Sequence, residues 1–384
     1  MNILYIHSTP LDYQQANIIQ VLNMCQAFAV SGAEVSLLIK ASKNEAVNTQ
    51  EWIKTHFGLR IAFRLIYFKS NFSIFGRFKE LGILFSSLNK LVKEETKNRD
   101  FDFVYLRNPI LLLVIKDKKM RVAFELHNNF LHPDSKVLAK LYEKLLLYYY
   151  KKNYIVKVIT ISEALKSFWV NKGILSSSVI CHHDGFNSEH FKKSIDKCDA
   201  REELNIDRKT KVVTYTGSLY QDRGIELIIE AAKFVQDALF FVVGGPQKRV
   251  DHYKRQLLGS DITNIVFTGR VEQELVVKYL FASDILLLIY TEKVPTINYC
   301  SPLKLFEYMA SGKIILGHSF PTITEVLTNG VNAILVEPNN VELFIGKLKE
   351  TLIINNIILG KNARTEAFRK YSWLKRAQMI MEQL

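Results

Sequence analysis

The sequence predicts an α/β protein made of two doubly wound domains, each with a parallel sheet between layers of helices. Its length of 384 residues suits two domains. Short apolar runs of strand length alternate with segments of helical period, and the alternation restarts after a polar, charged segment at 183–197. One continuous sheet is the alternative, but a single α/β domain seldom exceeds about 250 residues.

The first half opens with a strand–helix–strand unit. Residues 2–7 form an apolar run of the buried-strand type. In 14–31, apolar side chains recur three and four residues apart, which predicts an amphipathic helix that ends at Gly32. A second strand is expected at 34–39 and further strands at 103–106, 122–125 and 158–161.

The second half repeats this pattern. A helix is expected at 226–235, and strands are expected at 211–215, 239–243, 265–267 and 285–290. Two such sheets would face each other across a cleft at the carboxyl ends of their strands, which is where open α/β folds bind ligands.

The composition narrows the class of protein. The four cysteines are scattered, without a CxxC pair or a zinc-ligand spacing, which favours a reducing cytosol. No apolar run approaches the roughly 18 residues that span a bilayer, and the first ten residues lack the basic region of a signal peptide. We therefore expect a soluble, cytoplasmic protein, with attachment to a membrane face left open.

A net charge of +13, from 51 Lys and Arg against 38 Asp and Glu, is the unusual feature of the composition. It is compatible with nucleic acid, an anionic membrane surface or phosphorylated small molecules as the partner. The sequence has no RRM, KH, helix-turn-helix or zinc-finger signature, so no nucleic acid is expected.

The segment 301–312, SPLKLFEYMASG, has the pattern of a ligand-binding helix. Ser301 is a good N-cap, Pro302 a good first helical residue and Gly312 a C-terminal stop. Lys304 and Glu307 are three residues apart, so they share one face near the helix start. The lysine and the helix N-terminus would attract an anion, and the carboxylate would accept from sugar hydroxyls. The alternative is a capped amphipathic helix with a surface ion pair.

Glycine turns follow three predicted strands of the second half, at Gly217, at Gly244-Gly245-Pro246 and at Gly269-Arg270-Val271. Glycine at a strand-to-helix turn lets the backbone approach a ligand, and Arg223 in the first turn could clamp phosphate oxygens. Neither GxGxxG nor GxxxxGK[ST] occurs, so the dinucleotide and P-loop signatures are absent.

Taken in order, these segments resemble the family 4 glycosyltransferases of the GT-B fold. The resemblance rests on Gly217, Arg223-Gly224, Gly244-Gly245-Pro246, FTGRV, SDILLLIY, SPLKLFEYMASGKII, Glu325 with VLTNGVNAILVEP, and the terminal YSWLKRA. The first half matches more loosely through SGAEVSLL, YLRNP, FELHNNF and ITISEAL, and HHDGFNSEHF resembles the interdomain linker.

The resemblance implies a domain organisation. It places an N-terminal, acceptor-binding, Rossmann-like domain at 1–187 and a C-terminal, nucleotide-sugar-binding, Rossmann-like domain at 188–367. It also implies a C-terminal helix at 368–384 that crosses back onto the N-terminal domain.

The implied reaction moves a sugar from a nucleotide diphosphate sugar to a glycan or lipid-linked acceptor with retention of anomeric configuration. Such enzymes need neither a metal nor another cofactor and act in cell-envelope polysaccharide or glycolipid synthesis. A catalytically silent, nucleotide-binding partner subunit and a GT-B nucleotide-sugar epimerase remain the alternatives. For a retaining transferase we hypothesise front-face attack, in which the acceptor hydroxyl loses its proton to the leaving phosphate.

The resemblance also assigns site residues. Glu307 would accept from the nucleotide ribose, while Arg223 and Lys304 would neutralise the diphosphate. His127 would contact the donor sugar or acceptor, unless it is only a satisfied polar residue at a strand end. The rest of the donor site would be formed by Gly217, Ser218, Gly245, Val271, Ser301, Pro302 and Leu303. Two departures matter: Tyr299 stands where many members have a second glutamate, and Ser218 where arginine is frequent.

Most of the charge surplus lies in the first half, where residues 1–190 hold 25 Lys and Arg against 16 Asp and Glu. It concentrates in 71–97 and 136–152, where lysines are interleaved with Phe, Leu and Tyr. Basic amphipathic helices of this kind suit an anionic membrane surface, here the inner face of the cell membrane. Two core-packed helices with solvated lysine faces are the alternative.

Overall fold

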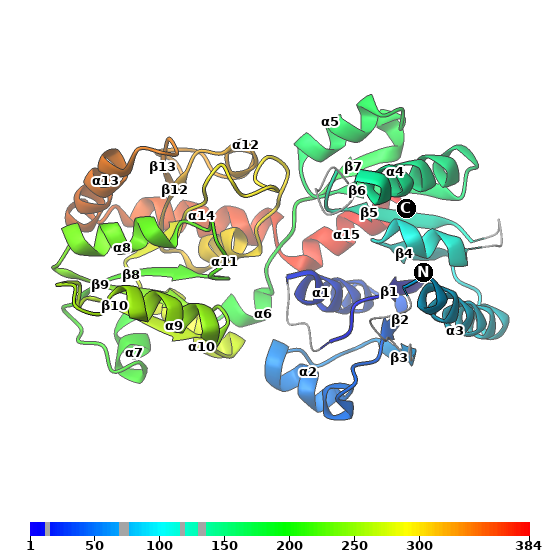
Figure 1. The fold of residues 1–384 in the computed structure, drawn as a ribbon, viewed down its shortest axis with the longest axis horizontal. Coiled ribbons are helices and arrows are strands. Elements are labelled where there is room, and N and C mark those ends of the chain that lie inside the picture. Colours follow the sequence, from blue (N-terminus) through cyan, green and yellow to red (C-terminus); the bar gives the residue numbers. More distant parts are fainter. Residues whose placement is uncertain (12–15, 69–76, 116–119, 130–135) are drawn as a thin grey trace. The chain divides into compact units, whose positions relative to one another are not determined.

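The structure is a computed structural model that describes residues 1–384 apart from 12–15, 69–76, 116–119 and 130–135. The chain divides into two compact units (Figure 1). Unit 1 is Met1–His183 together with Trp373–Leu384, and unit 2 is Asp184–Ser372. The chain therefore changes units at 183/184 and 372/373, a few residues from the expected 187/188 and 367/368.

Unit 1 contains a seven-stranded parallel sheet in the order β3-β2-β1-β4-β5-β6-β7. The strand order reverses at β1, which pairs in parallel with β2 on one side and with β4 on the other. The strands are β1 (Asn2–His7), β2 (Glu34–Lys40), β3 (Arg64–Phe68), β4 (Phe103–Leu106), β5 (Val122–Leu126), β6 (Ile155–Thr160) and β7 (Val179–Cys181).

The helices of unit 1 include one from the far end of the chain. The α-helices are α1 (Ala16–Val30), α2 (Gln50–Phe57), α3 (Arg77–Asn98), α4 (Lys136–Lys151), α5 (Glu163–Asn171) and α15 (Trp373–Gln383), with 3-10 turns at Glu45–Val47, Pro109–Val114 and Ser176–Ser178. The last helix, α15, packs against α1 within this unit (Figure 1).

Unit 2 contains a six-stranded parallel sheet in the order β10-β9-β8-β11-β12-β13. The strands are β8 (Lys211–Thr216), β9 (Ala238–Val243), β10 (Ile265–Gly269), β11 (Ile285–Leu288), β12 (Ile314–His318) and β13 (Ile334–Val336). The helices are α6 (Ser188–Phe191), α7 (Lys197–Glu203), α8 (Ile225–Phe234), α9 (Gln247–Gln256), α10 (Gln273–Ala282), α11 (Leu303–Ser311), α12 (Pro321–Thr324), α13 (Val341–Ile354) and α14 (Ile357–Lys370).

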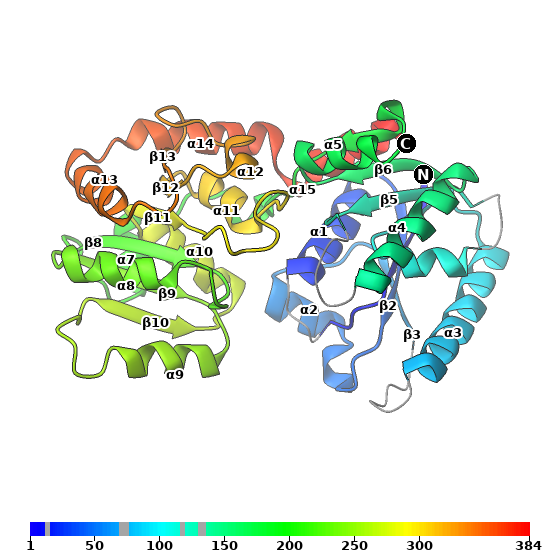
Figure 2. The same ribbon diagram turned by 45° about the horizontal axis from the view of Figure 1, so that its top comes forward.

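The strands of unit 2 are buried on both faces. Successive residues of a strand point to opposite sides, so Val212 and Leu286 enter one apolar cluster while Val213 and Leu287 enter the other. Helices cover both sides of the sheet, as Figure 2 shows. The predicted fold class, two parallel-sheet Rossmann-like domains, is confirmed.

Among the described residues, no helix combines the length and the apolar character that crossing a bilayer would need.

Candidate functional site

Helix α11 carries Lys304 and Glu307, but it begins later than the sequence predicts. Pro302 is the N-cap and makes no side-chain capping bond, and Leu303 is the first helical residue. Ser301 is therefore not the cap. Its hydroxyl accepts a hydrogen bond from the backbone N–H of Asp184 at 2.9 Å, which ties the first residue of unit 2 to the loop before α11.

Lys304 lies in an aromatic box rather than beside an acid. Its Nζ is 3.7 Å from the ring centroid of Tyr215 and 4.9 Å from that of Tyr290. Burial, reinforced by the nearby Arg223 guanidinium, holds the pKa of the Lys304 ammonium well below its usual range. No ion pair between Lys304 and Glu307 forms, so the surface-pair alternative is wrong for the described residues.

Arg223 belongs to the same cluster. Its guanidinium carbon is 5.5 Å from the centroid of Tyr290, the ring that also faces Lys304. It stands in a tight turn in which Asp222 and Gly224 both have positive φ, and Gly224 is the N-cap of α8 without a side-chain bond to the helix. In the part of the chain that the structure describes, neither cation has a carboxylate within ion-pairing distance. Two neighbouring cations without a counter-ion form a site for an anion.

Two glycine turns bring the backbone close to this cluster. A Cβ placed on Gly217 would lie 3.4 Å from the Lys304 Nζ, so the backbone of this turn borders the ammonium group. Gly217 donates its N–H to the Val243 carbonyl at 2.9 Å. Gly244 and Gly245 both have positive φ, and a Cβ on Gly245 would lie 2.3 Å from Leu219 Cγ. The two turns are thus packed against each other at adjacent strand ends.

We expect Gly244→Ala to destabilise this loop pair by more than about 1 kcal/mol. Gly244 has φ 112°, and its Cβ would lie 2.5 Å from the Gly217 carbonyl oxygen, so backbone must move. Thermal unfolding measures the effect. Gly346→Ala is the matched control, because Gly346 lies inside α13 with no atom within 4 Å of an added Cβ, and it should leave stability unchanged or raise it.

Glu307 is a partly buried carboxyl with one polar partner. The Gln273 amide donates to its Oε1 at 2.9 Å. Burial raises the pKa of Glu307 to about 7, and the Gln273 hydrogen bond only partly opposes that rise. A carboxyl with this pKa changes protonation near neutral pH, and it can ionise more fully when hydroxyl donors reach it.

The remaining predicted residues of unit 2 are placed less centrally. The Ser218 carbonyl accepts from the Tyr215 hydroxyl at 3.2 Å, which joins it to the Lys304 box. Val271 packs, partly buried, against the apolar cluster that contains Phe306 of α11. Tyr299, in the loop before α11, is 8% exposed. Among the described residues, neither Val271 nor Ser301 makes a hydrogen bond to Arg223 or Lys304.

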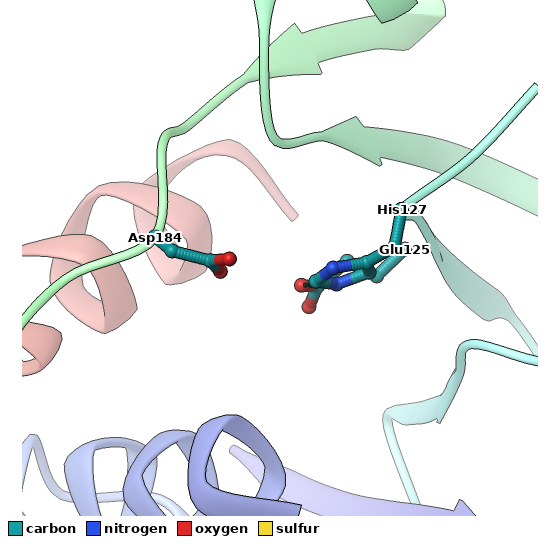
Figure 3. Close-up of side chains that lie close together, drawn as sticks. All are labelled: Glu125, His127 and Asp184. Atoms are coloured by element: carbon teal, nitrogen blue, oxygen red, sulfur yellow. Dashed lines mark hydrogen bonds and ion pairs between the residues drawn. The ribbon is translucent and has the colours of Figure 1, made fainter. Parts of the chain in front are cut away.

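His127 lies in unit 1, directly after β5, and it is bound to Glu125. The ring Nε2 is 2.5 Å from Glu125 Oε1, and Figure 3 shows the two side chains together at the strand end. Burial and the charge of Arg107 lower the pKa of His127 to about 4, so the ring is neutral at pH 7. Its Nε2–H then donates to the carboxylate, which leaves Nδ1 as the acceptor atom.

Two residues before His127, on β5, Glu125 is expected to point the same way and does so; the rest of the buried network around it was not predicted. Besides His127, it accepts hydrogen bonds from the Tyr105 hydroxyl, from Gln20 Nε2 at 2.5 Å and from Arg376 Nη2 at 3.0 Å. Burial opposes ionisation of Glu125, but Arg376 and His127 hold its pKa well below the usual range. Arg376 comes from α15, and its only sequence signal is a charge on the apolar side of the terminal helix.

The sequence of this chain is similar to those of glycosyltransferases. Residues 210–353 match the family model described as glycosyl transferases group 1. An uncharacterized glycosyltransferase of Methanocaldococcus jannaschii is 26% identical over 298 residues, 72% of this chain and 73% of that protein. A lipopolysaccharide 1,2-N-acetylglucosaminetransferase of Salmonella typhimurium is 25% identical over 242 residues, 59% of this chain and 61% of that protein.

Solved structures match along nearly the whole chain. Sucrose-phosphate synthase from Thermosynechococcus elongatus has a TM-score of 0.75 at 15% identity and covers 99% of this chain and 97% of its own. Anabaena HepE in complex with UDP and glucose has a TM-score of 0.72 at 15% identity, and the match covers 99% of this chain and 98% of HepE. The chain therefore has the GT-B fold, its residues 210–353 match the group 1 glycosyl transferase model, and the proteins it resembles in sequence are named as glycosyltransferases.

Proposed function

We propose that this chain is a family 4 glycosyltransferase that moves a sugar from a nucleotide diphosphate sugar to a glycan or lipid-linked acceptor, with retention and without a metal. The main observation behind this proposal is the pair formed by Arg223 and Lys304. Both cations contact the Tyr290 ring, and neither has a carboxylate partner among the described residues. The domain match over 210–353 includes both.

The leaving group explains why two such cations stand together. When the bond from the anomeric carbon to the diphosphate breaks, negative charge grows on the phosphate oxygens. Arg223 can bind two oxygens at once, and an anion beside Lys304 would raise the pKa of its ammonium back toward the ordinary range. The open backbone at Gly217 lets the diphosphate approach the Lys304 ammonium.

Glu307 would hold the nucleotide through its ribose hydroxyls, and His127 would hold the sugar or acceptor through Nδ1. We do not assign Glu307 or His127 as the general base. A neutral histidine with a pKa of about 4 is a weak base at pH 7. In the front-face reaction the acceptor hydroxyl gives its proton to the leaving phosphate, so kcat should not follow the titration of His127.

The pH dependence of nucleotide binding should follow Glu307. Its raised pKa of about 7 means that the carboxylate loses its charge as the pH falls through neutrality. Because the ionised form accepts two hydroxyl donors better, we expect affinity for the nucleotide diphosphate to fall by several-fold from pH 8 to pH 6. Glu307→Gln should bind more weakly at pH 8 and lose this dependence. Calorimetric titration of the nucleotide diphosphate at pH 6 and pH 8 measures these affinities. If Glu307→Gln kept the same pH dependence as the wild type, a group other than Glu307 would be responsible for it.

We propose that the acceptor belongs to the cell envelope, because the Salmonella relative is named for its action on lipopolysaccharide.

Helix α4 has an exposed apolar face. Val137, Leu138 and Leu141 are 79%, 44% and 49% exposed beside lysines, and the helix's Glu143 is paired with Lys172 at 2.8 Å. This supports a peripheral position on the inner face of the membrane, in the cytoplasm. The other predicted stretch, 71–97, lies partly outside the described residues.

A thermal-shift screen with UDP, GDP, ADP, CMP and dTDP tests the donor site. We expect at least one nucleotide to raise the melting temperature, and the shift should persist in a chelator because no metal is needed. A screen in which none of the five stabilises the chain would refute the nucleotide-sugar proposal. Nucleotide binding without transfer to any envelope acceptor would instead favour the silent partner subunit.

A further inference from the structure

The turn between α13 and α14 in unit 2 carries four isoleucines that the fold does not bury. Ile353, Ile354, Ile357 and Ile358 are 77%, 62%, 54% and 61% exposed. Asn355 ends α13 in the left-handed conformation, and the Asn356 side chain accepts from the Ile358 N–H, which caps α14. We call residues 353–358 the isoleucine knob. An apolar cluster of this kind on a surface marks an interaction site.

The charged side chains next to the isoleucine knob are mainly lysines, and the nearby acid Glu350 is paired with Lys347 at 2.7 Å. Lys349 precedes Ile353 by four residues, and Lys361 follows Ile357 by four, so each lies one helical turn from an isoleucine. Both lysines are exposed, and no Asp or Glu occurs from 351 to 365. Lysine stems can lie along an apolar surface while their ammonium groups reach an anionic layer.

A basic pocket adjoins the knob. Its volume is about 180 Å³, and Thr351, Leu352 and Asn355 form the wall on the side of α13. The rest of its lining includes five cations and one carboxylate, Asp284. The cations are Lys197, Arg201, Arg208, Lys209 and Lys211.

The ion pairs at this pocket leave cationic charge available. Asp284 binds both Arg201 and Lys197, at 2.8 and 2.9 Å. Arg208 is paired with Glu202 and Lys211 with Asp237, two exposed acids outside the pocket lining. Exposed ion pairs of this kind contribute little binding energy, so they leave both cations able to bind another anion. Lys209 has no ion pair among the described residues. Arg201 is buried and already donates to the Ala282 and Arg208 carbonyls and to Asp284, so a phosphate in the pocket would meet Lys209 and the exposed cations Lys197, Arg208 and Lys211.

We propose that the isoleucine knob and the basic pocket together dock unit 2 on an anionic phospholipid bilayer. The isoleucines would enter the interfacial layer, and the pocket would receive the phosphate of a lipid headgroup. A second copy of the chain fits less well, because a two-fold interface would set this pocket, whose lining has five cations and one carboxylate, against an identical pocket. A nucleic acid would find cations but no aromatic platform, since isoleucine does not stack on bases.

This surface is separate from the proposed donor site and does not depend on sugar transfer. It is also separate from the exposed face of α4, which belongs to unit 1. If both surfaces act, each unit has its own contact with the bilayer.

Flotation of the full chain with vesicles tests the surface. The vesicles contain equal parts of phosphatidylglycerol and phosphatidylcholine, or phosphatidylcholine alone. We expect the chain to float with the anionic vesicles, and changing all four isoleucines to serine to weaken partitioning about tenfold or more. Lys209→Glu should weaken it about tenfold. Leu258→Ser is the matched control, because Leu258 is 79% exposed in unit 2 outside this surface.

Each variant is also measured with Lys140 and Lys144 changed to Glu, so that binding through α4 does not hide the result. The substituted side chains are exposed, so melting temperatures should stay within a few degrees of the parent. Flotation that is absent, or unchanged in the isoleucine and Lys209 variants in both backgrounds, would overturn the proposal. So would a dimer in sedimentation that the isoleucine substitutions dissociate, since a second copy would then be the occupant.

Discussion

Changing Lys304 to alanine is expected to lower kcat by about 10²–10³-fold, the usual loss when one group that stabilises transition-state charge is removed. The Lys304 Nζ lies in the box of Tyr215 and Tyr290 with no acid beside it, so its charge serves an anion that arrives with the substrate. The loss should fall mainly on kcat, because charge on the leaving diphosphate is greatest in the transition state. Steady-state transfer kinetics measure it.

Although Lys304→Ala is expected to lose activity, it should not lose folding stability. The folded state depresses the pKa of Lys304, so the unfolded chain binds its proton more tightly at neutral pH. The wild-type chain then gains stability as the pH rises through the depressed pKa toward the ordinary value, and below that window the ammonium is a cost. Without nucleotide, Lys304→Ala should therefore melt at the same temperature or higher at pH 7.

Lys233→Ala is the matched control, because Lys233 also lies over an aromatic ring of unit 2, 5.5 Å from the centroid of Phe234, but on the surface of α8. It should change neither kcat nor nucleotide binding. If Lys304→Ala kept full activity, the leaving group would have to be stabilised without this ammonium, and the assignment of the anion site would fail.

Replacing Arg376 with methionine should destabilise unit 1 by about 3–5 kcal/mol, because it removes one partner of a buried ion pair and leaves the other charged. Arg376 and Glu125 are 1% and 0% exposed in their side chains, and the pair spans 251 positions of sequence. Arg376 also donates to the His182 and His183 carbonyls, at 3.2 and 2.9 Å. Urea denaturation measures the loss.

The pH dependence separates the ion pair from simple packing. Glu125 has a folded pKa well below its unfolded one, so its contribution is present above the unfolded pKa and is lost as the pH falls through the folded value. The difference between wild type and Arg376→Met should therefore shrink in acid. Arg369→Met, at an exposed arginine of α14, is the control and should change stability by less than about 0.5 kcal/mol.

A double variant completes this test. Combining Arg376→Met with Glu125→Gln should recover part of the lost stability, because no unpaired charge then remains in the core. Strictly additive losses would mean that Arg376 acts through its carbonyl contacts alone. His127, which is held by the same carboxylate, would then be positioned without help from α15.

Local patterns in the sequence predicted the framework of the site. The strand predicted at 103–106 is β4, and the expected strand at 211–215 differs from β8 by one residue. Apolar period and glycine turns suffice for this, because strands and their ends depend on neighbouring residues. Lys304 and Glu307 were placed on one helix for the same reason. Ser301 was misassigned as the cap because a good N-cap residue also makes tertiary hydrogen bonds, here with Asp184.

Sequence alone thus determined two parallel α/β domains and the helix and turns that carry Arg223 and Lys304, because burial and turn formation leave short-range patterns. Only the tertiary structure decided which groups meet. It set Lys304 against Tyr215 rather than Glu307, joined Arg376 to Glu125 across 251 positions of sequence, and placed the isoleucine knob beside a basic pocket. The physical reason is that charge pairing and exposure depend on side chains far apart in sequence, which no local period records.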